Sequence, residues 1–157
     1  MNSNILVIRS LFLSFIFIFI AAFSALAQAE INGKSALGRW KTIDDETGKP
    51  KSIVEIYLEN GKYTGKIVQL FRRPEEDQDP SCDKCPSGDA RKGQKINGMV
   101  IIKNMSKKSD KYADGEILDP KKGEVYDLTM WLEKENTLKV RGWWGWVYRT
   151  QTWYREN

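Results

Sequence analysis

The sequence predicts an all-β protein, and within that class a single eight-stranded antiparallel up-and-down β-barrel. From residue 30 onward, short segments of alternating apolar and polar residues are separated by turn signals, with no long stretch of helical periodicity. Consecutive hairpins that close into a barrel also leave no exposed strand edge. We expect the strands at residues 37–44, 52–59, 62–71, 98–105, 111–119, 124–133, 137–142 and 147–155.

Three glycines favour this barrel over the alternative, a two-sheet sandwich. The alternation places Gly65, Gly115 and Gly142 at inward positions. Glycine inside a strand is costly unless the sheet bends sharply or another group approaches closely. Because the strands of a small closed barrel are sharply coiled, they need such points.

The first 29 residues have the layout of a secretory signal peptide. Arg9 precedes an apolar run over residues 11–23, and small residues then give a signal-peptidase site that ends at Ala27 or Ala29. An uncleaved membrane anchor is the alternative, but the apolar run is short for a hydrocarbon layer of about 30 Å. We expect cleavage, a single barrel domain over residues 30–157, and export to the periplasm or out of the cell.

Turn chemistry predicts the register of the second and third strands. Asn60-Gly61 is a two-residue type I′ signal, which pairs Glu59 with Lys62. Three apolar pairs follow from this turn, all on one face: Leu58–Tyr63, Ile56–Gly65 and Val54–Ile67. Because a slip of one residue would move every apolar side chain to the other face, this agreement supports the register.

Two later hairpins give similar tests. The turn at residues 119–123 has Pro120 early and Gly123 late, which pairs Asp119 with Glu124. The neighbours expected from this turn are Ile117–Tyr126, Gly115–Leu128 and Ala113–Met130. In the following hairpin, Leu132 and Leu138 share a face if the loop between them has an odd number of residues.

Residues 72–97 form a long loop, since this segment has three prolines and many acidic and small residues. Unpaired segments of this length tend to be lids or other functional excursions. Cys82 and Cys85, the only cysteines of the chain, lie here. In an exported protein we expect a disulfide that pins the loop. The alternatives are free or metal-bound thiols and a redox-active pair, which the acidic neighbours Asp79 and Asp83 disfavour.

The absence of histidine from the sequence narrows the possible chemistry. It removes the commonest general base and the commonest metal ligand, and with them a Ser-His-Asp triad, a Cys-His pair and His-bound zinc. The acidic residues of the long loop do not have the spacing of a calcium loop. No carboxylate pair is singled out as catalytic, so we expect no enzyme, no metal and no cofactor. The net charge of +4 is spread along the chain, which argues against a nucleic-acid partner.

Aromatic residues concentrate near the C-terminus, at Trp143, Trp144, Trp146 and Tyr148. In a hairpin connection, alternate tryptophans cannot all face one core, so some must lie on the barrel rim or in its mouth. They either plug one end of the barrel or form a platform that binds a ligand or a partner by stacking and apolar burial.

Gly38-Arg39-Trp40 opens the first expected strand, and Arg155 ends the last. This is similar to the calycin (lipocalin-like) arrangement, in which an early tryptophan packs under an arginine of the final strand. A wider pattern resembles the bacterial domain-of-unknown-function family numbered 2147. It comprises Gly38-x-Trp40, Cys82-x-x-Cys85, Gly115–Pro120, Leu138–Gly142 and Arg149–Trp153. The resemblance implies a small secreted, lipocalin-like barrel and carries no established activity. The three tryptophans after Gly142 depart from the family pattern.

Two functions fit these observations. In the first, the barrel binds a small apolar or amphipathic molecule in the cell envelope, with the long loop as a lid. In the second, the barrel is solid and docks a protein or a glycan through its tryptophan-rich hairpin. The candidate ligand-binding residues are Trp40, Tyr126, Trp143, Trp144, Trp146 and Tyr148, with Arg141 and Arg155 as partners for a carboxylate. The ligand and the oligomeric state stay open.

Overall fold

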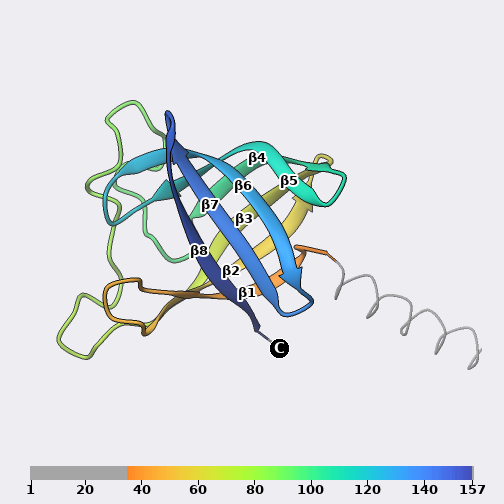
Figure 1. Cartoon of the computed structure of the whole chain (residues 1–157). Helices are drawn as coiled ribbons and strands as arrows, with labels where there is room; N and C mark the ends of the chain where they lie inside the picture. The colour runs from red at the N-terminus through yellow and green to blue at the C-terminus, as the bar shows by residue number, and fades with distance from the viewer. Residues whose placement is uncertain (1–34, 157) are drawn as a thin grey trace, which may run out of the picture. The chain divides into compact units, whose positions relative to one another are not determined.

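Eight antiparallel strands close into one barrel in the computed structural model, which describes residues 35–156 (Figure 1). Each strand pairs with the next, and β1 pairs with β8 through Trp40 and Arg155, so the sheet has no open edge. The predicted eight-stranded up-and-down barrel is confirmed, and the sandwich alternative was wrong. The strands are β1 (Gly38–Ile43), β2 (Pro50–Glu59), β3 (Lys62–Leu70), β4 (Val100–Lys108), β5 (Lys111–Asp119), β6 (Glu124–Lys134), β7 (Thr137–Trp144) and β8 (Val147–Glu156).

The predicted signal peptide, with its cleavage site at Ala27 or Ala29, lies outside the described residues. The described chain begins at Ser35 and forms one compact unit. In that part of the chain, no helix is long and apolar enough to cross a membrane. Export therefore stays a prediction.

The alternating strand directions give the barrel two different ends (Figure 1). The closed end, as we call it, carries residues 35–37 and three short turns, at 60–61, 109–110 and 135–136. The open end carries the other four connections, at 44–49, 71–99, 120–123 and 145–146.

The predicted β2–β3 register is confirmed. Asn60 and Gly61 have φ values of 51° and 75°, as a type I′ turn requires. The three apolar pairs expected from that turn are all present: Leu58–Tyr63, Ile56–Gly65 and Val54–Ile67. Leu58 is nevertheless exposed, because it lies next to the turn. Phe71, the last residue of the expected third strand, lies one residue beyond β3 and is also exposed.

The predicted β5–β6 register is correct from the turn to Gly115–Leu128 and wrong beyond it. Met130 pairs with Tyr112 rather than with Ala113, because the register shifts between Tyr112 and Gly115. Asp114, within this irregular stretch, has a φ of 63°. The shift turns Tyr112 inward, where it is buried. In the next hairpin, Leu132 does pair with Leu138, and a register shift follows between Leu132 and Lys134.

Close approach explains two of the three inward glycines. A Cβ on Gly115 would lie 2.3 Å from the Lys103 carbonyl oxygen and 2.4 Å from the Met105 sulfur. A Cβ on Gly65 would lie 3.0 Å from Ile102. Both glycines let neighbouring strands and side chains approach more closely than a methyl group allows. Gly142 is different, because a Cβ there would meet only ordinary van der Waals contacts.

Residues 35–37 and the first and last strands seal the closed end. Trp40 is fully buried, and its indole nitrogen donates a hydrogen bond of 2.8 Å to the Ala36 carbonyl. The Arg155 guanidinium carbon lies 4.3 Å from the centre of the Trp40 ring. Its nitrogens donate to the carbonyls of Leu37 and Ser35, each at 2.9 Å. The tryptophan–arginine packing that the lipocalin-like resemblance implied is therefore present.

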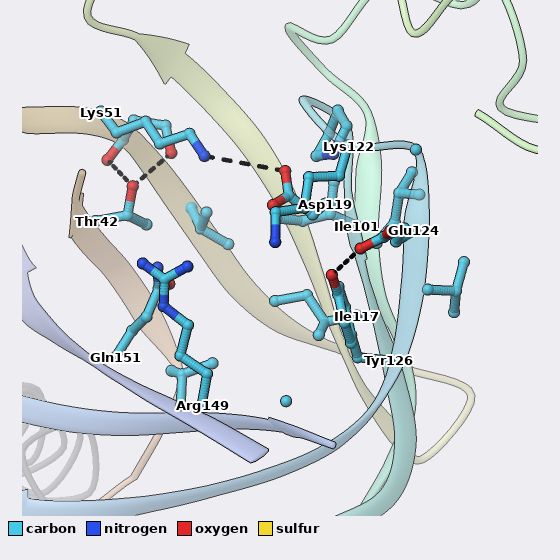
Figure 2. A pocket seen from close by; sticks show the side chains of 18 of the residues that line it. Thr42, Lys51, Ile101, Ile117, Asp119, Lys122, Glu124, Tyr126, Arg149 and Gln151 are labelled. Carbon is cyan, nitrogen blue, oxygen red and sulfur yellow. Dashed lines mark hydrogen bonds and ion pairs between the residues drawn. The ribbon is translucent and has the colours of Figure 1, made fainter. Parts of the chain in front are cut away.

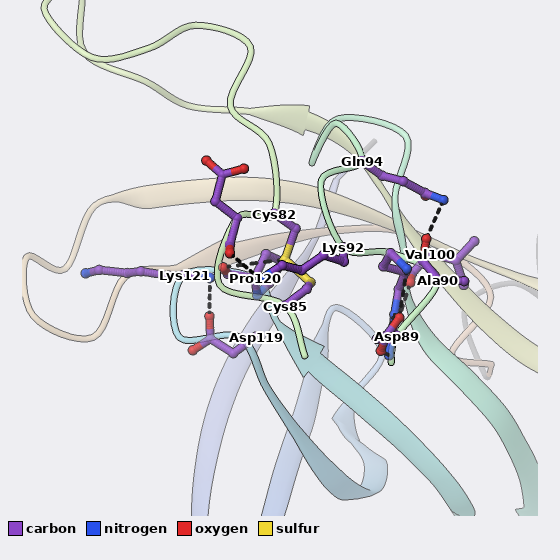
Figure 3. Close-up of a disulfide and its surroundings, with 12 residues drawn as sticks. Cys82, Cys85, Asp89, Ala90, Lys92, Gln94, Val100, Asp119, Pro120 and Lys121 are labelled. Atoms are coloured by element: carbon purple, nitrogen blue, oxygen red, sulfur yellow. Dashed lines mark hydrogen bonds and ion pairs between the residues drawn. A yellow bond between two sulfur atoms is a disulfide. The ribbon is translucent and has the colours of Figure 1, made fainter. Parts of the chain in front are cut away.

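The long loop between β3 and β4 is held by a disulfide (Figure 3). A buried arginine, Arg91, also holds it. Cys82 and Cys85 are bonded to each other and buried, as predicted. Arg91 is only 5% exposed and binds both carboxylate oxygens of Asp89, while it also donates to the Val100 carbonyl at 3.3 Å. The Arg91 hydrogen bonds hold the pKa of Asp89 well below its usual range. This part of the loop is therefore anchored to the start of β4.

Candidate ligand-binding cavity

A cavity of about 770 Å³ occupies the open half of the barrel (Figure 2). Its deep wall consists of buried side chains from five strands: Val54, Ile67, Ile101, Val140 and Trp153. Ligand sites of proteins commonly have volumes of about 300–1,000 Å³ and mainly apolar linings. The barrel is thus filled at its closed end and hollow at its open end, a difference that the inward residue pattern does not reveal.

Gly142 contributes space to this cavity. A Cβ on Gly142 would lie 3.4 Å from Tyr126 Cβ and 4.0 Å from Ile117, and its φ is not in the left-handed region. All three residues line the cavity. The absence of a side chain at Gly142 therefore enlarges the cavity, although the backbone at this position does not require glycine.

Tyr126, one of the predicted ligand-binding residues, lies in the cavity wall beside Glu124. Its hydroxyl donates a hydrogen bond to the Glu124 carboxylate (Figure 2). Burial, together with this hydrogen bond and the Glu124 charge, raises the pKa of Tyr126 to about 12. The hydroxyl is therefore a neutral donor at physiological pH.

Polar groups gather toward the mouth. Thr42 and Ser52 are buried and face each other across the β1–β2 pair. Their hydroxyl oxygens are hydrogen-bonded at 2.7 Å. Arg149 and the Gln151 amide both donate to the Asp45 carboxylate, the latter at 2.5 Å. Gln151 also accepts a hydrogen bond from the Trp153 indole at 3.3 Å. A polar network thus runs along one wall, from the rim to the deep part of the cavity.

Charged side chains also surround the mouth (Figure 2). Lys51 and Asp119 lie 4.0 Å apart, and Lys122 lines the cavity beside them. The opening is thus lined by three cations, those of Lys51, Lys122 and Arg149, and by two carboxylates, those of Asp119 and Glu124. The arrangement offers both signs of charge to a polar group at the mouth and an apolar environment below it.

The disulfide segment forms part of the rim. Pro86 lines the cavity, and the Cys82 sulfur lies 3.8 Å from the Pro120 carbonyl oxygen (Figure 3). A Cβ on Gly123 would lie 1.8 Å from the Lys84 carbonyl oxygen, so the loop packs directly on the backbone of the β5–β6 turn. Gly123 has a φ of 76°, which also favours glycine. This segment forms part of the wall of the mouth, and the lid role that the sequence suggested stays a prediction.

The tryptophan-rich hairpin does not plug the barrel. Trp144 and Trp146 are 77% and 90% exposed, and Tyr148 is also exposed. Trp144 and Tyr148 line the mouth of the cavity, and Trp146 lies in the turn beyond it. Trp143 is half-buried and packs against Tyr148, with ring centres 4.8 Å apart. Trp40 and Trp153, and not these residues, fill the barrel interior.

The remaining predicted site residues lie outside the cavity. Trp40 and Arg155 belong to the closed end described above. The Arg141 guanidinium carbon lies among three aromatic rings, 5.0 Å from the centre of Trp131, 5.5 Å from Trp143 and 4.3 Å from Tyr148. Neither Arg141 nor Arg155 lines the cavity, so the contact with a carboxylate ligand that the sequence suggested for them has no support from the cavity lining.

Sequence reasoning missed several lining residues, among them Thr42, Ser52, Arg149 and Gln151. Alternation along β8 was the available signal, because Arg149 and Gln151 share the inward face with Trp153 and pair with Gly142 and Val140. A polar residue on that face indicates that it meets solvent or a polar ligand there.

The closed barrel with one sealed end has a lipocalin-like fold. A solved structure with the same fold is protein HP1028 from the human pathogen Helicobacter pylori, described as belonging to the lipocalin family. The two match with a TM-score of 0.66 and 19% sequence identity, over 78% of this chain and 84% of that one. The chain belongs to the DUF2147 family, described as an uncharacterized protein conserved in bacteria, whose model matches residues 38–155. No curated protein matches the chain.

Proposed function

We propose that this protein is an exported, non-enzymatic carrier of the cell envelope that binds one small apolar or amphipathic molecule in its barrel. The cavity of about 770 Å³, apolar in its deep part and polar at its mouth, is the observation that carries the proposal. The lipocalin-like fold supports it, since small closed barrels of this size hold one small ligand when they are not filled.

The distribution of polar groups also indicates how the ligand is oriented. In the deep part of the cavity, Val140 offers apolar surface, and the indole nitrogen of Trp153 already donates its hydrogen bond to Gln151. Lys51, Lys122 and Arg149 line the mouth. Because burying an unpaired polar group costs free energy, an amphipathic ligand binds with its apolar part inward and its polar part at the mouth.

Filling the cavity tests the proposal. The probe is 1-anilinonaphthalene-8-sulfonate, which has an apolar ring system and an anionic group and fluoresces in apolar surroundings. Gly142→Leu places a side chain in the cavity with no backbone obstacle. We expect the affinity for the probe, measured by fluorescence titration of residues 30–157, to fall at least tenfold.

Gly88→Leu is the matched control. Gly88 has no atom within 4 Å of an added Cβ, no positive φ and no place in the cavity lining. This variant should keep the probe affinity of the wild type. Equal affinities of all three proteins would show that the probe binds elsewhere and would refute the carrier proposal.

Export requires its own measurement. The segment Ala25–Ala29, with its small residues, supports cleavage at Ala27 or Ala29. Mass spectrometry of the chain from the envelope fraction of a bacterial host should give a mature N-terminus at residue 28 or 30. A full-length chain retained in the inner membrane would contradict export as a soluble carrier.

A further inference from the structure

The tip of the β7–β8 hairpin is the most exposed apolar part of the described chain. Trp146 and Trp144 are 90% and 77% exposed, more than the other large hydrophobic residues among residues 35–156. Val147 is 50% and Tyr148 54% exposed. In Figure 1 this hairpin projects from the barrel on the side of the open-end loops. An exposed group of this composition needs an explanation, because monomeric proteins rarely expose large contiguous apolar patches.

The charges next to the tip have a regular arrangement. Residues 142–148 contain no charged side chain, and Arg141 and Arg149 flank them. Gly142 pairs with Arg149 and Arg141 with Thr150, so the two arginines lie at almost the same height on the hairpin. About three residues separate this level from the turn, which at about 3.3 Å per residue places the tip about 10 Å further out.

This arrangement matches the interface of a lipid bilayer. Tryptophan and tyrosine concentrate at the level of the lipid headgroups, and interfacial segments insert their apolar residues by about 5–10 Å. Arg141, at the base of the tip, then lies at the level of the lipid phosphates, which arginine binds well, whereas Arg149 already pairs with Asp45. Arg141 forms no ion pair with a carboxylate among the described residues, and its guanidinium bonds to the Thr150 hydroxyl at 2.8 Å.

We propose that the β7–β8 tip inserts into the surface of a lipid bilayer and holds the open end of the barrel against it. The proposal rests on the carrier function and adds its partner. Trp144, Val147 and Tyr148 both belong to the tip and line the mouth of the cavity. Docking through them brings the mouth to the membrane, so that an amphipathic ligand passes between bilayer and cavity with little contact with water.

Vesicle flotation with residues 30–157, which contain all eight strands, tests this docking. The predicted leader is left out because its apolar run would bind lipid by itself. Vesicles of phosphatidylcholine with phosphatidylglycerol are compared with vesicles of phosphatidylcholine alone. We expect the wild type to float with both, more with the anionic vesicles, and the double variant Trp144→Ser, Trp146→Ser to lose at least tenfold in partition coefficient.

A matched double variant controls for the loss of exposed apolar area. Leu58 and Tyr154 are 53% and 49% exposed and lie toward the closed end. The variant Leu58→Ser, Tyr154→Ser should therefore float like the wild type. Equal losses in both double variants, or no flotation of the wild type, would overturn the proposal. The latter result is also the one expected if the tip instead fits a pocket of a protein partner.

The cavity-filled variant separates this proposal from the carrier function. Gly142→Leu leaves the tip residues in place, so it should float normally while it loses the probe. Probe binding by the wild type without flotation would refute only the docking. Flotation without any probe binding would refute only the carrier.

Discussion

The two ends of the barrel are built on opposite principles. At the closed end, Trp40 is fully buried, its indole nitrogen is bonded, and Arg155 covers its ring while it binds the carbonyls of Ser35 and Leu37. At the open end, Gly142 leaves a cavity and Trp146 extends into solvent. Tryptophan and arginine occur at both ends, but in different surroundings. Trp40 and Arg155 close the interior at one end, whereas Trp144 and Arg149 line the mouth of the cavity at the other.

This division has a physical basis. Apolar burial and close packing at one end supply folding free energy, so the other end can keep unfilled space. Among residues 35–156, no buried side-chain nitrogen or oxygen lacks a hydrogen-bond partner. The open end is therefore not a badly folded region. Each of its strands pairs with a neighbour on both sides. It differs from the closed end in that apolar side chains do not fill its interior.

The largest expected effect contrasts two tryptophans. Trp40→Ala should reduce the free energy of unfolding by about 3–5 kcal/mol, because it opens a void in the sealed core. Trp146→Ala removes an almost fully exposed side chain and should stay within about 0.5 kcal/mol of the wild type. Urea denaturation followed by circular dichroism measures both. Similar losses in the two variants would show that the hairpin tip contributes to the core.

The next contrast is between two arginines. Arg155→Gln should cost about 2–3 kcal/mol of unfolding free energy, since charge-assisted hydrogen bonds to the carbonyls of Leu37, Ser35 and Glu135 are lost. Arg149→Gln removes a surface ion pair with Asp45 and should cost at most about 1 kcal/mol. Urea denaturation followed by circular dichroism measures the cost of each substitution. A larger cost at Arg149 would contradict the assignment of stability to the closed end.

Two inward glycines give a third, smaller contrast. Gly115→Ala should cost about 1–3 kcal/mol, because the methyl group would overlap the Lys103 carbonyl and the Met105 sulfur. Gly142→Ala should be neutral or stabilising by about 0.4–1 kcal/mol, since the site has room and alanine restricts the unfolded chain. Thermal unfolding of the two single variants compares them. If Gly142→Ala were the more damaging change, the cavity at that position would be smaller than the structure shows.

The glycines also show how far the sequence predicts this molecule. Alternation and turn residues predicted the eight strands, the closed barrel and most of the register, because these depend on local chemistry and on which face is buried. The shift at Asp114 was missed, since positive φ in a non-glycine residue has no strong sequence signal. Gly115 and Gly142 read alike in the sequence, yet one meets a backbone and the other a cavity.

The candidate site was predicted less well than the fold. Three of the candidate ligand-binding residues that the sequence indicated line the cavity: Tyr126, Trp144 and Tyr148. Thr42, Ser52 and Gln151 were not named, since small polar residues are common everywhere on strands. Their proximity depends on how β1, β2 and β8 close the barrel, which no single segment encodes. Whether these residues bind a ligand stays a prediction.

The smallest expected effect concerns Tyr126 at high pH. Burial and Glu124 raise its pKa to about 12, above the value of about 10 in an unfolded chain. A raised pKa means that the folded protein binds this proton more tightly, so its small contribution to stability is complete below pH 10 and is lost between pH 10 and about 12. The difference in phenolate absorbance between the wild type and Tyr126→Phe measures the titration directly. Glu124→Gln should lower the pKa of Tyr126 only part of the way, because burial, the largest cause, remains.

The neutral state of Tyr126 below pH 10 also has a consequence for binding. Its titration should not change the affinity for the anionic probe in that range. A loss of probe affinity below pH 10 that Tyr126→Phe abolishes would show that the cavity wall ionises, and that the open end is less shielded from solvent than its buried side chains indicate.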